Sequence, residues 1–128
     1  WTTDELGIEK TFCCIQSNAR DFAKLGSLLL NGGKFENVPL IDEKFISQMI
    51  TPTQNSNGVY GMGVWTNYDS KIHHYYLRGL YGQYVIVVPE YDMIIVRFGN
   101  KEGEQKDLKN RPAEVEFYID EALKLTQK

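Results

Sequence analysis

Hydrophobic residues recur at helical spacing early in the chain. The first such set comprises Phe22, Leu25, Leu28 and Leu29. Ser17 or Asn18 stands before this set in a capping position, and Asn31-Gly32-Gly33 follows it with the flexibility that a helix end needs. The pattern therefore predicts a helix over about 17–31.

Two further sets have the same spacing. A short helix is expected over about 42–50, where Asp42 is placed to cap it and Pro52 to end it. A longer helix is expected over about 112–126, because proline is tolerated at a first helical position and an apolar stripe follows it. The segment 34–39 between the first two helices predicts a short hairpin or turn.

After the second helix the hydrophobic period becomes two, which is typical of strands. Strands are expected over about 59–66, 74–88 and 93–99. The second is interrupted at Gly79 and Gly82, where a bulge or bend is expected. The end of the second strand and the third strand are β-branched runs joined by four residues, a pattern that predicts a hairpin.

This order of elements predicts an α+β fold, a three-stranded antiparallel sheet with flanking helices. The hairpin strands are apolar on both faces, so the sheet should be covered on both sides. The length of 128 residues suits a single domain, 1–128. A net charge of −3 argues against a nucleic-acid partner, and no apolar run is long enough to cross a membrane.

The adjacent Cys13 and Cys14 have no metal-like spacing to each other or to His73 and His74. Neighbouring cysteines rarely bridge, because their Cα atoms lie closer than disulfide geometry prefers. We expect two small buried apolar side chains, on or beside a short strand or entry segment at 12–15, and no metal site.

Four blocks of residues occur in order across about residues 12 to 99. They are Ser17 to Gly33 (SNARDFAKLGSLLLNGG), Leu40 to Pro52, Tyr60-Gly61-Met62-Gly63-Val64-Trp65, and Gly79 to Arg97. As an ordered set they resemble the serine β-lactamase-like hydrolases, which include class C β-lactamases, DD-peptidases, esterases and 6-aminohexanoate-dimer hydrolases. The resemblance implies the C-terminal part of a β-lactamase/transpeptidase-like fold.

The family's nucleophile motif, Ser-x-x-Lys, is absent from this sequence. Its second motif, Tyr-x-Ser, occurs only at Tyr68-Asp69-Ser70, in an expected turn and downstream of the helix that it should precede. In the family both motifs lie N-terminal to the first block. The resemblance therefore implies that Trp1 begins after them, that the parent hydrolyses an ester or amide through an acyl-enzyme, and that this chain alone is inactive. The alternative is a non-catalytic binding or structural module that kept the fold.

The resemblance also implies one wall of an active-site cleft, formed by the segment Leu77 to Gln83. It makes the backbone N–H of Leu80 a candidate oxyanion-hole donor, beside a Gly79 that leaves room for an acyl group. Candidate substrate-binding side chains are Arg78, Tyr81, Gln83 and His74. Arg78 suits a substrate carboxylate, or else it is a strand arginine with a solvated head. Gln83 is expected to brace the oxyanion loop. For Tyr81 and His74 packing on the sheet is the commoner role, because half-buried sheet aromatics outnumber ligand contacts.

No cofactor is implied, and the expected partner is a small-molecule ester or amide. Because the family's sheet has further strands beside these, an exposed sheet edge is expected, and self-association through it. Relatives are often exported, which favours the periplasm or the cell surface.

Overall fold

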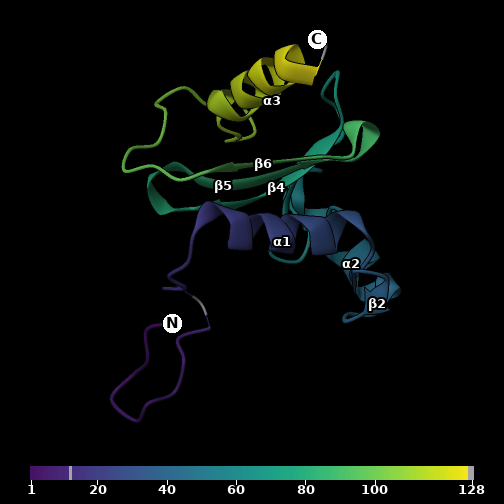
Figure 1. The fold of residues 1–128 in the computed structure, drawn as a ribbon. Coiled ribbons are helices and arrows are strands. Elements are labelled where there is room, and N and C mark those ends of the chain that lie inside the picture. The colour runs from purple at the N-terminus through teal and green to yellow at the C-terminus, as the bar shows by residue number, and fades with distance from the viewer. Residues whose placement is uncertain (12, 127–128) are drawn as a thin grey trace.

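A computed structural model describes residues 1–11 and 13–126. The sheet lies between two helical layers (Figure 1). Helix α1 (Ala19–Leu30) covers one face and helix α3 (Ala113–Thr126) the other. The prediction of an α+β fold with a sheet covered on both sides is therefore confirmed. The third covering helix, α2 (Glu43–Ile50), lies beside the end of α1.

The main sheet has four antiparallel strands, not the three that were predicted. Their order is β3 (Trp65–Asn67), β4 (His74–Gly79), β5 (Gln83–Val88) and β6 (Met93–Arg97). The expected strand 74–88 is two strands, because the turn η2 (Leu80–Gly82) reverses the chain completely. Tyr81 and Gly82 adopt φ values of 59° and 76°, which a continuous strand cannot contain.

The predicted strand 59–66 is also wrong over most of its length. The chain folds back at Gly61, whose N–H donates to the carbonyl of Val64 at 2.8 Å, and only Trp65–Asn67 pairs with β4. A Cβ atom at Gly61 would lie 2.0 Å from the carbonyl oxygen of Met49. Glycine at this position thus permits a close backbone approach to α2 that an alternating strand pattern does not reveal.

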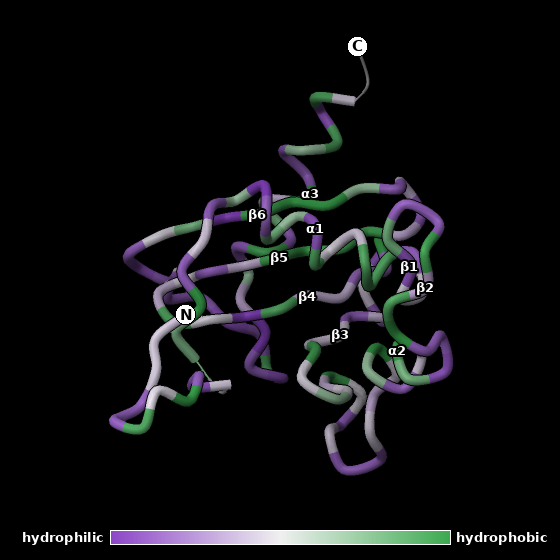
Figure 2. The backbone as a smooth tube through the Cα atoms, turned by 60° about the horizontal axis from the view of Figure 1, so that its bottom comes forward, coloured by the Kyte–Doolittle hydropathy of each residue, from purple (hydrophilic) through white to green (hydrophobic). Residues whose placement is uncertain are grey.

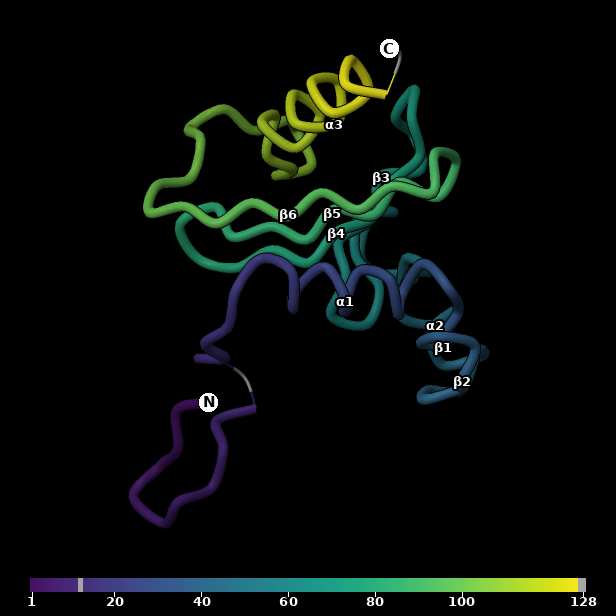
Figure 3. Tube along the Cα trace, in the orientation of Figure 1, coloured from purple at the N-terminus to yellow at the C-terminus, as the bar shows by residue number. Residues whose placement is uncertain are grey.

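Local signals account for the helix ends. Asn18 caps α1, since its side chain accepts a hydrogen bond from the backbone N–H of Asp21. The chain leaves α1 through Gly32 and Gly33 with φ of 60° and 89°. Asp42 caps α2 in the same way by accepting from Phe45. The segment between them forms a two-stranded hairpin, β1 (Lys34–Phe35) and β2 (Val38–Pro39), seen beside α2 in Figure 3.

Each face of the sheet has its own buried cluster. Under α3 the buried members are Tyr76, Tyr84, Ile86, Val88, Val115 and Ile119. On the face of α1 they are Leu29, Ile46, Val64, Tyr75 and Val87. Alternate residues of β5 enter opposite clusters, so the strand is hydrophobic along most of its length (Figure 2).

Residues 1–11 and 13–16 form an arm that extends away from the sheet on the side of α1 (Figure 1). Thr3 and Glu9 pair across it in a single β-bridge. Cys13 and Cys14 are joined by a disulfide, and Cys14 is exposed with φ of 73°. The expectation of two unbridged, buried cysteines on a strand is therefore wrong for these residues, and Phe12 lies outside the described part of the chain.

Candidate functional site

The last residues of β4 extend past the end of β3. The register pairs Trp65 with Tyr76, and β3 begins at Trp65, so Leu77–Gly79 has no ladder partner on that side among the described residues. On the other side the same residues pair with β5. Because alternate residues of an antiparallel strand direct their N–H and C=O groups to opposite edges, this open edge presents backbone polar groups to whatever lies beside it.

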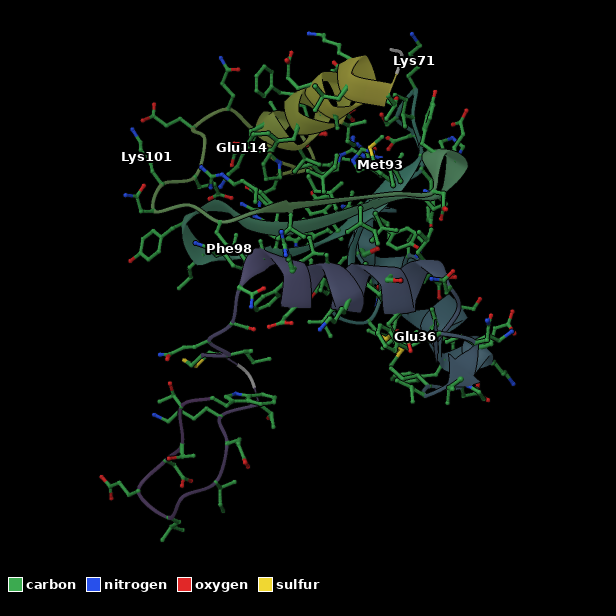
Figure 4. The ribbon with its side chains drawn as sticks, viewed as in Figure 1. Glu36, Lys71, Met93, Phe98, Lys101 and Glu114 are labelled. Carbon is green, nitrogen blue, oxygen red and sulfur yellow. A yellow bond between two sulfur atoms is a disulfide. The ribbon has the colours of Figure 1, made fainter. Side chains whose placement is uncertain are left out.

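A cavity of about 540 Å³ lies at this open end of β4. Its lining residues come from the segment before α1 and its first turn, from the segment before β3, from β4 and β5, and from the residue after β6. They are Ile15, Gln16, Ser17, Phe22, Gly63, Leu77, Arg78, Gly79, Gln83, Tyr84, Val85 and Phe98. Phe98 lies at the end of the sheet next to the first turn of α1 (Figure 4). Arg78, Gly79 and Gln83 of the predicted site are thus brought together on one cavity wall.

The η2 turn carries the predicted residues Leu80 and Tyr81 next to this cavity. Both side chains are exposed, at 79% and 64%. Arg97 of β6 holds the turn from the face of α3, since its guanidinium donates to the carbonyl oxygens of Tyr81 at 3.0 Å and Gly82 at 2.5 Å. A third bond reaches the carbonyl of Lys101 at 2.9 Å. The turn is therefore fixed by two charge-assisted hydrogen bonds from Arg97, and the third bond ties the same side chain to the segment after β6.

Two glycines make room for the Arg97 guanidinium. A Cβ atom at Gly82 would lie 2.0 Å from its Nη1, and one at Gly99 would lie 2.2 Å from the same atom. Arg97 was matched only as the last residue of the fourth sequence block, without a role. Gly82 and Gly99 are the sequence signal for its position, because residues without a side chain let the guanidinium approach the backbone closely.

Arg78 does not project freely into solvent. Its Nε donates to Glu102 Oε1 at 2.8 Å, and its Nη2 lies 2.5 Å from the same oxygen. Its Nη1 donates to the carbonyl of Asn110, and the guanidinium lies 5.1 Å from the centroid of the Trp65 ring. The interpretation as a strand arginine with a solvated head is wrong, because the side chain is only 12% exposed and bound within the protein, and the binding of a substrate carboxylate stays a prediction.

Gln83 and His74 also have local partners. The Gln83 amide donates to the Gly99 carbonyl and accepts from the Gly99 N–H, so the side chain joins β5 to the end of β6. The backbone N–H of Gln83, not its side chain, bonds the η2 turn, at the carbonyl of Leu80. His74 is buried under α3, away from the cavity, where its Nδ1 bonds the carbonyl of Ile72 at 2.8 Å. Burial lowers the pKa of His74, which keeps its ring neutral.

Arg78 and Glu102 form an ion pair only while the Glu102 carboxyl is ionised. Burial acts to raise the pKa of Glu102, but the hydrogen bond and charge of Arg78 outweigh it and the pKa is lowered. Glu102 is therefore anionic at neutral pH. Nothing local in the sequence indicates this role, because Glu102 stands in a charge-dense segment and its partner Arg78 is far away along the chain.

The tyrosines near β4 act as donors or as packing groups. Burial raises the pKa of Tyr75 to about 12, so it stays protonated at neutral pH. Burial and then a hydrogen bond to Glu114 raise the pKa of Tyr84, whose hydroxyl donates to Glu114 at 2.7 Å. Neither is placed to act as a general base. Within residues 1–11 and 13–126 no group of three His, Cys, Asp or Glu side chains is arranged to hold a metal ion.

No helix of the described chain is long and apolar enough to cross a membrane.

No protein-family model matches the sequence, and no curated protein matches it. The fold, however, is similar to that of a solved structure.

A solved structure with this likeness is that of a protein from Bacillus anthracis described as a putative 6-aminohexanoate-dimer hydrolase. The TM-score is 0.77 at 23% sequence identity, over 99% of this chain and 34% of that one. This chain thus spans about a third of its neighbour's length. At this identity the likeness shows the fold, and it agrees with the fold that the four sequence blocks implied.

Proposed function

We propose that this chain forms one wall of the active site of a serine hydrolase that cleaves an ester or amide through an acyl-enzyme. The observation that supports this most is the cavity at the open end of β4. There Gly79 and the exposed η2 turn adjoin a space of about 540 Å³, a size that suits a small-molecule site.

In this proposal a serine outside the present sequence gives its hydroxyl proton to a general base that is also outside this sequence and attacks the substrate carbonyl, and the carbonyl π electrons move to its oxygen. The N–H of Leu80 donates a hydrogen bond to that oxyanion. When the intermediate collapses, the bond to the leaving alcohol or amine breaks and the base gives that group its proton. The acyl group stays on the serine until water attacks it; it then leaves as the acid, and the serine hydroxyl is restored. The contribution of this chain is a rigid donor, since Arg97 fixes the turn from behind.

A variant with proline at position 80 tests the donor directly. Leu80 is the first residue of the η2 turn, and Gly79 before it is extended with φ of −110° and ψ of 176°, so the backbone accommodates proline there. In the complete hydrolase, Leu80→Pro removes the N–H and should lower kcat by about 10²–10³. Leu80→Ala keeps the N–H and is the matched control. Equal activities for the two variants would contradict the role of this donor.

The alternative is a non-catalytic binding or structural module that kept the fold. The coding sequence upstream of Trp1 separates the two: a Ser-x-x-Lys motif there supports the hydrolase, and a start codon next to Trp1 supports the module. The 128-residue chain alone should neither hydrolyse a p-nitrophenyl ester nor react with a fluorophosphonate. If it does either, the nucleophile lies within it and the proposal is wrong.

We also propose self-association of the isolated chain through the edge of β6. This strand is the last of the four, and on its outer side it has no strand partner within the described residues. Its apolar residues Met93–Val96 are only partly buried. Light scattering at increasing concentration should show a rising mass, and a constant monomer mass would count against this edge.

A further inference from the structure

The cavity beside β4 has a largely apolar wall. Ile15, Phe22, Leu77, Val85 and Phe98 supply its aliphatic and aromatic lining. The rings of Phe22 and Phe98 meet edge to face with centroids 5.2 Å apart, which joins α1 to the end of β6 across one side of the cavity. A wall of this kind favours a ligand group that gains by leaving water.

Among the described residues Arg78 is the one charged residue in the lining, and its guanidinium is already paired with Glu102, which also pairs with Lys106. Glu102 accepts two of its donors, Asn110 accepts a third, and Trp65 lies against its plane. A substrate carboxylate that bound Arg78 would have to share its guanidinium with Glu102 and so lie close to a second carboxylate. The repulsion between the two like charges opposes the binding of an anion.

Three of the four other polar side chains of the wall are occupied as well, and the fourth, Gln16, is uncharged. Ser17 donates its hydroxyl proton to Asp21 at 2.6 Å. The Gln83 amide is bound to Gly99 through both its oxygen and its nitrogen. The Tyr84 hydroxyl is bound to Glu114 on the other face of the sheet. A charged ligand group would therefore lose its water without gaining a charged partner.

We propose that this cavity binds the uncharged, apolar part of the substrate, so that the ester or amide has a neutral aliphatic or aromatic group there and no carboxylate. This inference rests on the proposed function, since it names the substrate class of that site. It replaces the expectation that Arg78 binds a substrate carboxylate: Glu102 sets the selectivity by neutralising Arg78.

The test is an NMR titration of the isotopically labelled chain at pH 7 with hexanamide and with hexanoate, which have the same alkyl chain and differ in charge. Hexanamide should shift the backbone N–H signals of Phe22, Leu77 and Val85. Hexanoate should bind at least about tenfold more weakly. Glu102→Gln should raise hexanoate affinity and narrow that ratio. Glu104→Gln is the matched control, because Glu104 is in the same segment, is 88% exposed and pairs only with Lys101.

The inference is overturned if hexanoate binds as tightly as hexanamide, if neither ligand shifts the cavity signals, or if a folded Glu102→Gln chain gains no more hexanoate affinity than Glu104→Gln. Binding here needs no nucleophile. A hydrolase whose Leu80 variants show no oxyanion effect could still show this selectivity, and a failed titration would leave the Leu80 result intact. The two proposals therefore fail separately.

Discussion

The two faces of the sheet are built on different physical principles. The face of α1 is mostly apolar: Gly26 lets the helix backbone lie directly on Ile94 and Val85, and the cavity opens at the end of this face. The face of α3 buries tyrosines and arginines whose polar groups bind carboxylates and backbone carbonyls. Two adjacent residues of β4 lie on opposite faces: Leu77 packs on the face of α1, and Arg78 binds Glu102 on the face of α3. The polar face thereby removes charge from a cavity that belongs to the apolar face.

The largest expected effect is on the close packing of α1. A Cβ atom at Gly26 would lie 2.7 Å from Ile94 Cγ2 and 3.0 Å from Val85 Cγ1. Gly26→Leu should therefore push the helix from the sheet and lower the free energy of unfolding by about 3 kcal/mol in urea denaturation. Lys24→Leu, at an exposed position of the same helix, is the control and should change little. Equal stability of the two variants would show that α1 does not pack as described.

On the face of α3 the largest effect should come from Arg97. Arg97→Met removes three hydrogen bonds from a charged group and should cost about 2 kcal/mol of unfolding free energy. It should also increase hydrogen exchange at the η2 turn, whereas Arg97→Lys should recover part of the loss. Unchanged exchange at residues 80–82 would mean that Arg97 does not hold the turn.

Two tyrosines on this face offer a matched pair. Tyr84 donates to Glu114, whereas the Tyr76 hydroxyl is buried and has no hydrogen-bond partner among the described residues. Tyr84→Phe should cost about 1.5 kcal/mol, and Tyr76→Phe should be neutral or stabilising, because it removes an unsatisfied polar group. Chemical denaturation measures both. The reverse order would contradict the hydrogen-bond pattern of this face.

These contrasts also explain what the sequence could predict. The helices lie close to their expected positions because caps and apolar stripes are local: Asn18, Asp42 and the glycines after α1 act within a few residues of themselves. The end of β3 could not be predicted, since it depends on Gly61 meeting the backbone of Met49. For the site, the resemblance indicated the segment around Gly79, but Glu102 is defined only by a contact with Arg78 across the fold.

The smallest effect concerns pH. Hydrogen bonds from Arg111, and to a smaller extent from Lys109, hold the pKa of Asp69 well below its usual range. Burial acts to raise the pKa of Asp107, but hydrogen bonds from Arg111 outweigh it and the pKa is lowered. A folded-state pKa below the unfolded value of about 3.9 means that this stability is complete above about pH 5 and is lost as the pH falls further. Arg111→Met should cost about 1 kcal/mol at pH 7 and flatten the loss below pH 4. Parallel urea midpoints for both proteins across pH 2–7 would refute this.

The central claim is that the cavity beside β4 holds the neutral part of a substrate whose carbonyl lies at the η2 turn. The most direct test is the crystal structure of the complete hydrolase after reaction with a hexyl fluorophosphonate. We expect a hexyl chain inside the cavity, against Phe22, Leu77 and Phe98, and a phosphoryl oxygen within hydrogen-bond distance of the Leu80 N–H. An adduct whose hexyl chain lies outside this cavity and whose phosphoryl oxygen faces other donors, or a protein that does not react, would contradict it.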